Sequence, residues 1–62
     1  MTWEELKDEA KKMGYDITGV GGLAIEDDVF TFWQDGKIDV DGVCVSDDRT
    51  PDQMLAIMKA LQ

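Results

Sequence analysis

Apolar and polar residues change their spacing along the chain, and each spacing predicts a different kind of element. Near the start, apolar side chains recur every three or four positions, at Trp3, Leu6, Ala10 and Met13. This is the period of one face of an α-helix. Thr2 and Glu5 have the spacing of a capping box, and Gly14 is a typical residue just beyond a helix end. We therefore predict a helix over residues 3–13.

The C-terminal part of the chain shows the same helical period. Its apolar positions are Met54, Leu55, Ile57, Met58 and Leu61. Thr50 is a good N-cap, Pro51 suits the first helical position, and Gln53 completes a second capping box. These signals predict a helix over residues 51–61.

Residues 23–46, between the two helices, contain stretches with the period of two that is typical of half-buried strands. Asp35-Gly36 signals a hairpin among them. A two-residue loop would place Phe32 opposite Asp39, whereas a three-residue loop, Gln34-Asp35-Gly36, places Phe32 opposite Ile38 and Phe30 opposite Val40. Because a one-residue slip moves every side chain to the other face, burial decides between the two registers. We predict the three-residue loop, with Gly36 in the left-handed conformation.

Asp41-Gly42 predicts a second hairpin, with a two-residue turn. This turn would pair Val40 with Val43. One step further from the turn, it would pair Ile38 with Val45.

Asp27-Asp28 predicts a third turn, although Asp-Asp is a poorer turn sequence than Asp-Gly. As a two-residue turn it would pair Ile25 with Phe30. It would also pair Leu23 with Phe32. Because Asp-Asp is the poorer turn sequence, the strand before the turn is the least certain one.

The three turns agree on one apolar sheet face. That face holds Leu23, Ile25, Phe30, Phe32, Ile38, Val40, Val43 and Val45. The opposite face holds Val29, Thr31, Trp33, Lys37, Asp39, Asp41, Cys44 and Ser46. Agreement between independent local signals supports a fold prediction.

The predicted fold is a single two-layer α+β domain over residues 1–62. Its order is a helix, a three- or four-stranded antiparallel meander and a helix, with both helices on one sheet face. Residues 15–22 leave two alternatives open, because Tyr15, Ile17 and Val20 would suit either the core or a short edge strand.

Composition excludes several classes of function. The formal net charge is −8, and residues 26–52 hold nine acidic residues against Lys37 and Arg49. Such a charge argues against direct contact with nucleic acid or an anionic membrane. The absence of His and the single Cys exclude an internal disulfide and the usual zinc ligand sets. No apolar run reaches the ~20 residues of a membrane span, and the acidic start does not resemble a signal peptide. We expect a cytoplasmic protein.

Three motifs resemble known chemical sites, and none predicts a cofactor, a metal or an enzyme. Residues 37–48 resemble a calcium loop, but Lys37 stands where the first oxygen ligand should be and Asp48 replaces the final Glu. Residues 19–24 match a dinucleotide-binding spacing without the strand before it or the helix after it. Cys44 has no His to activate its thiol.

Both ends of the chain resemble a known group of proteins. Thr2-Trp3-Glu4-Glu5-Leu6 and Arg49-Thr50-Pro51-Asp52-Gln53-Met54, with the Gln34-Asp35-Gly36 turn between them, look like short uncharacterised proteins of Firmicutes and their prophages. That resemblance covers most of the chain and implies no known activity, so it assigns no functional residues.

The sheet face without helices remains as the candidate functional surface. It places the aromatic side chain of Trp33 among polar groups, which is typical of surfaces that bind proteins. The predicted interaction residues are Val29, Thr31, Trp33, Asp39, Asp41 and Cys44. We expect a non-enzymatic interaction module that binds an unknown protein partner or forms a homodimer. The alternative is an acidic DNA mimic that inhibits a nucleic-acid-binding protein.

Overall fold

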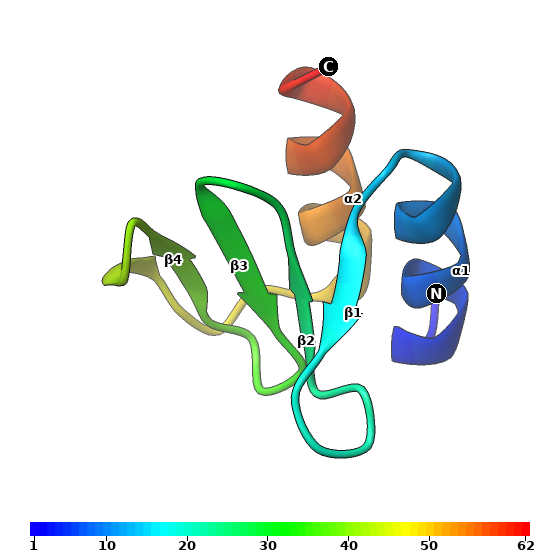
Figure 1. The fold of residues 1–62 in the computed structure, drawn as a ribbon, viewed down its shortest axis with the longest axis horizontal. Helices are drawn as coiled ribbons and strands as arrows, with labels where there is room; N and C mark the ends of the chain where they lie inside the picture. Colours follow the sequence, from blue (N-terminus) through cyan, green and yellow to red (C-terminus); the bar gives the residue numbers. More distant parts are fainter.

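The computed structural model describes residues 1–62, which form two helices and a five-stranded antiparallel sheet (Figure 1). The elements are α1 (Trp3–Lys12), β1 (Asp16–Thr18), β2 (Ala24–Glu26), β3 (Phe30–Trp33), β4 (Ile38–Val40), β5 (Val43–Ser46) and α2 (Pro51–Ala60). The strands lie in the sheet in their order along the chain, so β1 and β5 are its edges. The α+β class is as predicted, but the sheet has five strands rather than three or four.

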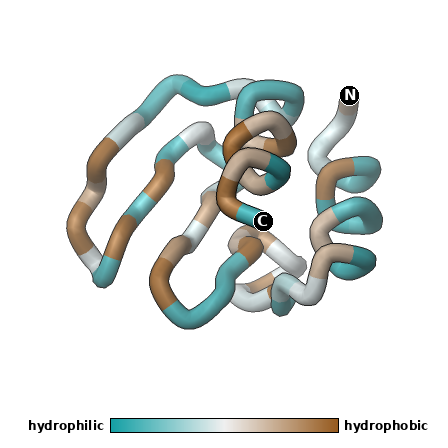
Figure 2. The backbone as a smooth tube through the Cα atoms, turned by 90° about the horizontal axis from the view of Figure 1, so that it is seen from above, coloured by the Kyte–Doolittle hydropathy of each residue, from teal (hydrophilic) through white to brown (hydrophobic).

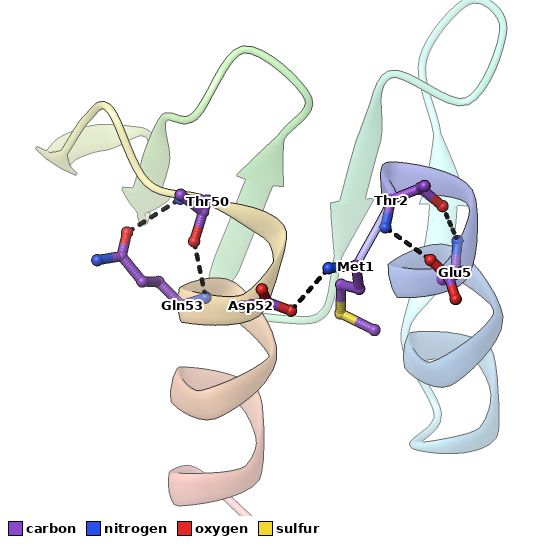
Figure 3. Close-up of polar contacts among 6 residues, drawn as sticks. All are labelled: Met1, Thr2, Glu5, Thr50, Asp52 and Gln53. Atoms are coloured by element: carbon purple, nitrogen blue, oxygen red, sulfur yellow. Dashed lines mark hydrogen bonds and ion pairs between the residues drawn. The ribbon is translucent and has the colours of Figure 1, made fainter.

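Both helices begin at the predicted capping boxes (Figure 3). The Thr2 hydroxyl accepts a hydrogen bond from the Glu5 N–H at 3.1 Å, and the Glu5 carboxylate accepts one from the Thr2 N–H at 2.8 Å. Thr50 and Gln53 repeat this arrangement at the start of α2. The boxes satisfy backbone donors that a helix start otherwise leaves unpaired.

The predicted hairpin between β3 and β4 is confirmed. Phe32 lies opposite Ile38 and Phe30 lies opposite Val40, so the loop has three residues. Gly36 has a φ of 102°, and its N–H donates to the Trp33 carbonyl at 3.0 Å. Glycine adopts this conformation without the cost that a Cβ would impose.

The turn between β2 and β3 lies one residue further along the chain than predicted, because the Asp27 N–H donates to the Phe30 carbonyl at 3.0 Å and leaves Asp28 and Val29 between them. The Asp27 carboxylate accepts hydrogen bonds from the N–H groups of Val29 and Phe30, which fixes the turn at this position. Ile25 therefore lies opposite Phe32 instead of Phe30. The shift is two residues, so Ile25 stays on the predicted face. Leu23 falls outside β2 and is exposed, which corrects the prediction that it faces the core.

The hairpin between β4 and β5 keeps its turn but not its full register. Val40 lies opposite Val43 as predicted, whereas an irregularity between Ile38 and Asp39 places Ser46, not Val45, opposite Ile38. Val43 and Val45 are exposed, so their predicted burial is wrong. A β-bulge adds one residue to one strand and disturbs the alternation beyond it.

The core combines both helices with three strands. Ile17, Ile25, Phe32 and Ile38 are direct cross-strand neighbours, so they share one sheet face, which we call the core face. The buried cluster consists of Trp3, Leu6, Ala10, Tyr15, Ile25, Phe32, Ile38, Met54 and Met58. The rings of Tyr15 and Phe32 make an edge-to-face contact, with centroids 6.0 Å apart and planes at 74°.

The two helices run in the same direction. The N-terminal ammonium of Met1 contacts the Asp52 carboxylate at 3.0 Å, which joins the start of α1 to the start of α2 (Figure 3). At the other end, the Gln62 side-chain amide donates to the Met13 carbonyl at 3.0 Å. Neither helix has the length and apolar character needed to cross a membrane.

Candidate functional site

Trp33 is the centre of the candidate site. It lies at the end of β3, directly opposite Ala24 of β2, and its side chain is half-buried. Its indole N–H donates a hydrogen bond to the Asp39 carboxylate of β4 at 2.9 Å. Ala24 shares the sheet face of Trp33 and is buried, which indicates that the indole lies over it. The hydrogen bond to Asp39 thus restricts the orientation of the ring.

A row of polar side chains crosses the sheet next to Trp33. Direct cross-strand pairing connects one residue from each strand, in the order Asp16, Glu26, Thr31, Asp39 and Cys44. We call these five residues the acidic row. Because side chains alternate along a strand, the acidic row lies on the face opposite the core face.

The carboxylates of the acidic row have no cationic partner within the chain. The ion pairs of the structure use Glu4, Glu9, Asp35 and Asp52, all outside the row. Asp16 lies directly opposite Glu26, and like charges in that position destabilise a strand pair. The face therefore carries concentrated negative charge that the fold itself does not neutralise.

Four of the six predicted interaction residues come together on this face. Thr31, Asp39 and Cys44 are neighbours in the acidic row, and Trp33 is bonded to Asp39. Asp41 lies in the turn after β4, with a left-handed φ of 51°. Val29 lies elsewhere: it lines a hollow of about 260 Å³ together with residues that follow the two helices, Met13, Gly14, Tyr15, Leu61 and Gln62, and with Asp27 and Phe30.

Sequence analysis missed Asp16, Ala24 and Glu26 as members of this face. β1 was one of two open alternatives, so its partner residues on β2 were not placed. The alternation of Asp16, Ile17 and Thr18 is the signal that would have found them, because Ile17 continues the core face and the other two point away from it.

A smaller hollow lies beside Trp33. Its volume is about 100 Å³, and it is lined by Leu23, Trp33, Gln34 and Asp35. The exposed side chain of Leu23 therefore lies on the same hollow as Trp33. Leu23 thus adds to the apolar part of this surface, whereas the sequence predicted that it would be part of the core.

Two ionisable groups have clearly displaced pKa values, and both lie away from Trp33. Hydrogen bonds from the Thr2 backbone and hydroxyl lower the pKa of the Glu5 carboxyl. Burial raises the pKa of the Tyr15 phenol, and the Asp27 carboxylate raises it further. The Glu5 shift belongs to a helix cap and the Tyr15 shift to the core.

Residues 37–48 do not wrap around a central point, as a calcium loop does. They form β4, a turn in which Asp41 and Gly42 have positive φ, and β5. Asp39 is turned to Trp33, and no group of three or more acidic or Cys side chains in the chain is arranged to hold a metal ion. The exposed Cys44 thiol makes one weak hydrogen bond, to the Ser46 carbonyl.

Comparison of the chain with protein-family models, curated proteins and solved structures finds no match. The functional argument therefore rests on the geometry of the acidic row and Trp33.

Proposed function

We propose that this chain is a small non-enzymatic interaction module that binds a partner protein through the sheet face of Trp33 and the acidic row. The observation that carries the proposal is the indole of Trp33, fixed by Asp39 and bordered by unpaired carboxylates. Interfaces commonly place an aromatic anchor in the centre and polar groups at the rim. A ring that is already oriented loses little conformational freedom on binding.

The proposal assumes that both helices lie against the core face, which leaves the face of Trp33 open. Their shared buried cluster with Ile25, Phe32 and Ile38 supports this arrangement. It also assumes that the protein is located in the cytoplasm, in keeping with the single free thiol of Cys44.

A different protein is a better partner for this face than a second copy. A symmetric dimer through the acidic row would bring Asp16, Glu26 and Asp39 of each copy near those of the other. Repulsion between like charges opposes that contact. A partner surface with Lys or Arg side chains would neutralise the row, and Arg would also stack on the indole.

The test compares capture of proteins from the source cell by four forms of the chain. The wild type and Val20→Ser should retain the same partner, because Val20 is 89% exposed in the loop before β2. Trp33→Ala should lose it. Thr31→Lys should lose it too, since the new cation lies between Glu26 and Asp39 and covers the face while leaving the fold intact.

Salt dependence separates the proposal from the DNA mimic. Binding that combines the aromatic anchor with charge pairs should weaken between about 50 and 500 mM salt but keep the share of affinity that Trp33 supplies, whereas a mimic held by charge pairs alone should lose nearly all of its affinity. Retention of the partner by Trp33→Ala and Thr31→Lys would disprove the proposal. Loss of nearly all affinity with salt, together with binding that Trp33→Ala leaves unchanged, would favour the mimic.

A further inference from the structure

β5 is an edge strand whose outer side has no partner in the chain. The Asp41 N–H donates to the Val29 carbonyl, so the backbone of Asp41 is directed toward the β3 side. Successive residues of a strand direct their backbone groups to alternate sides. The backbone N–H and C=O of Val40 therefore point to β5, and those of its partner Val43 point to β4. Those of the next residue, Cys44, point outward.

The side chains of β5 are unusually apolar for an exposed edge. Val43 is 64% exposed and Val45 is 59% exposed. In Figure 1 the β4–β5 hairpin lies at the side of the sheet away from α1, and Figure 2 shows hydrophobic segments along it. Natural edge strands commonly carry Lys or Pro, which discourage pairing with another chain. β5, with the sequence Val-Cys-Val-Ser, has neither.

The two ends of β5 are strongly acidic. Asp41 precedes the strand, and Asp47 and Asp48 follow it, all of them exposed. Arg49 is the nearest cation along the chain, and its Nε–H is engaged by the Ser46 hydroxyl at 2.6 Å. Two copies of β5 paired edge to edge would bring these acidic ends together. A cationic partner strand would meet attraction at both ends instead.

We propose that β5 binds an extended segment of another protein, which adds to the sheet as a sixth, antiparallel strand. The segment would carry β-branched apolar residues that cover Val43 and Val45, and Lys or Arg at both ends. Its backbone would pair with the outward N–H and C=O of Cys44. This mode of recognition takes affinity from backbone hydrogen bonds and specificity from alternate side chains. It uses the edge of the sheet instead of the face of Trp33 and does not depend on the function proposed above; Cys44 belongs to both surfaces, through its side chain on the face and its backbone at the edge.

The test uses a synthetic peptide of about nine residues, a common strand length, in which alternating Val and Thr are flanked by Lys. Titration of the full chain, followed by NMR, should shift the backbone amides of β5 most, and the Cys44 amide should become protected from exchange. The same peptide with the amides on its pairing edge N-methylated should bind at least about tenfold more weakly, because it can no longer donate to the Cys44 carbonyl and its methyl groups keep the two backbones apart. A Glu-flanked peptide should lose about as much.

Protein variants control for the site. Val45→Lys places a charge on the edge and should abolish peptide binding, whereas Val20→Lys adds the same charge on a distant loop and should leave most of it. Trp33→Ala should bind the peptide like the wild type.

Three results would overturn the proposal. Equal binding of the N-methylated peptide would mean that surface charge alone holds it. Amide shifts centred on Trp33 would place the peptide on the acidic row. Dimerisation of the chain by itself, abolished by Val45→Lys, would mean that a second copy occupies the edge.

Discussion

The indole N–H of Trp33 and the carboxylate of Asp39 are joined by a hydrogen bond of 2.9 Å between two neighbouring strands. Asp39 is thereby both a member of the acidic row and the group that orients the only aromatic side chain on that face. The bond links the charge of the surface to the position of its aromatic anchor.

Removing the acceptor should destabilise the fold measurably. Asp39→Ala leaves a part-buried indole N–H without a partner, which should cost about 1–3 kcal/mol of unfolding free energy in urea. Asp39→Asn should cost less, since the amide oxygen can still accept. Asp28→Ala is the control, because the exposed Asp28 carboxylate makes no hydrogen bond or ion pair, and it should stay within about 0.5 kcal/mol of the wild type. Equal effects of Asp39→Ala and Asp28→Ala would show that the Trp33–Asp39 bond does not stabilise the fold.

Two glycines in turns allow a matched comparison. At Gly36, an added Cβ would lie 3.0 Å from the Arg49 nitrogen and 3.1 Å from its carbonyl oxygen. At Gly42 it would meet nothing within 4 Å. Both have positive φ, so each change to Ala should cost about 1 kcal/mol or more from backbone strain.

Gly36→Ala carries an additional cost, because the added Cβ pushes against Arg49, whose N–H is bonded to the Gly36 carbonyl at 3.0 Å. We expect Gly36→Ala to be less stable than Gly42→Ala by at least ~1 kcal/mol, measured by urea unfolding. Similar losses in the two variants would mean that the contact with Arg49 yields without cost.

The two capping boxes should respond differently to acid. The lowered pKa of Glu5 means that its carboxylate stabilises the start of α1 above its ordinary pKa of about 4.3, and that this contribution is lost as pH falls through the lower folded value. Gln53 has the same place in α2 and does not titrate. In NMR spectra at falling pH, the Thr2 amide should shift before the Thr50 amide. Glu5→Gln should remove the difference, and a parallel shift of both amides in the wild type would contradict the prediction.

The single Tyr of the chain allows a test at alkaline pH. Because burial raises the pKa of Tyr15 above its unfolded value of about 10, its contribution to stability is present below that value and is lost as pH rises through the folded pKa. The phenolate absorbance of the folded protein should appear at a higher pH than that of the urea-unfolded chain. Asp27→Asn should move the folded titration part of the way back, since the amide oxygen can still accept from Val29 and Phe30 while the charge is removed.

Local signals predicted the parts of the fold that depend on local chemistry. The two capping boxes, the Gln34-Asp35-Gly36 loop and the pairing of Val40 with Val43 are all present. Each depends on residues within a few positions of one another. In each case one backbone conformation satisfies the turn or cap and also buries the apolar side chains.

The errors arise where the register depends on contacts beyond the turn itself. The Asp27 side chain supplies hydrogen bonds that place the turn before β3 at Asp28-Val29 instead of Asp27-Asp28, and alternation alone does not reveal them. β1 is three residues long, too short for a clear period, and forms because β2 offers a free edge. The alternating Val43 and Val45 have the pattern that is typical of buried strand residues. They are exposed because β5 is an edge strand of the sheet. The acidic row depends on β1, so only Thr31, Asp39 and Cys44 of it were predicted.

The contacts between Met1 and Asp52 and between Gln62 and Met13 also limit how this fold can change in length. Every antiparallel strand reverses the direction of the chain, so an odd number of strands leaves the first and last helices parallel. A single strand gained or lost would reverse α2 and separate both pairs of residues. A whole hairpin gained or lost would keep them together. We therefore expect versions of this fold to differ by pairs of strands, with the helix pair conserved as the unit that closes the chain on itself.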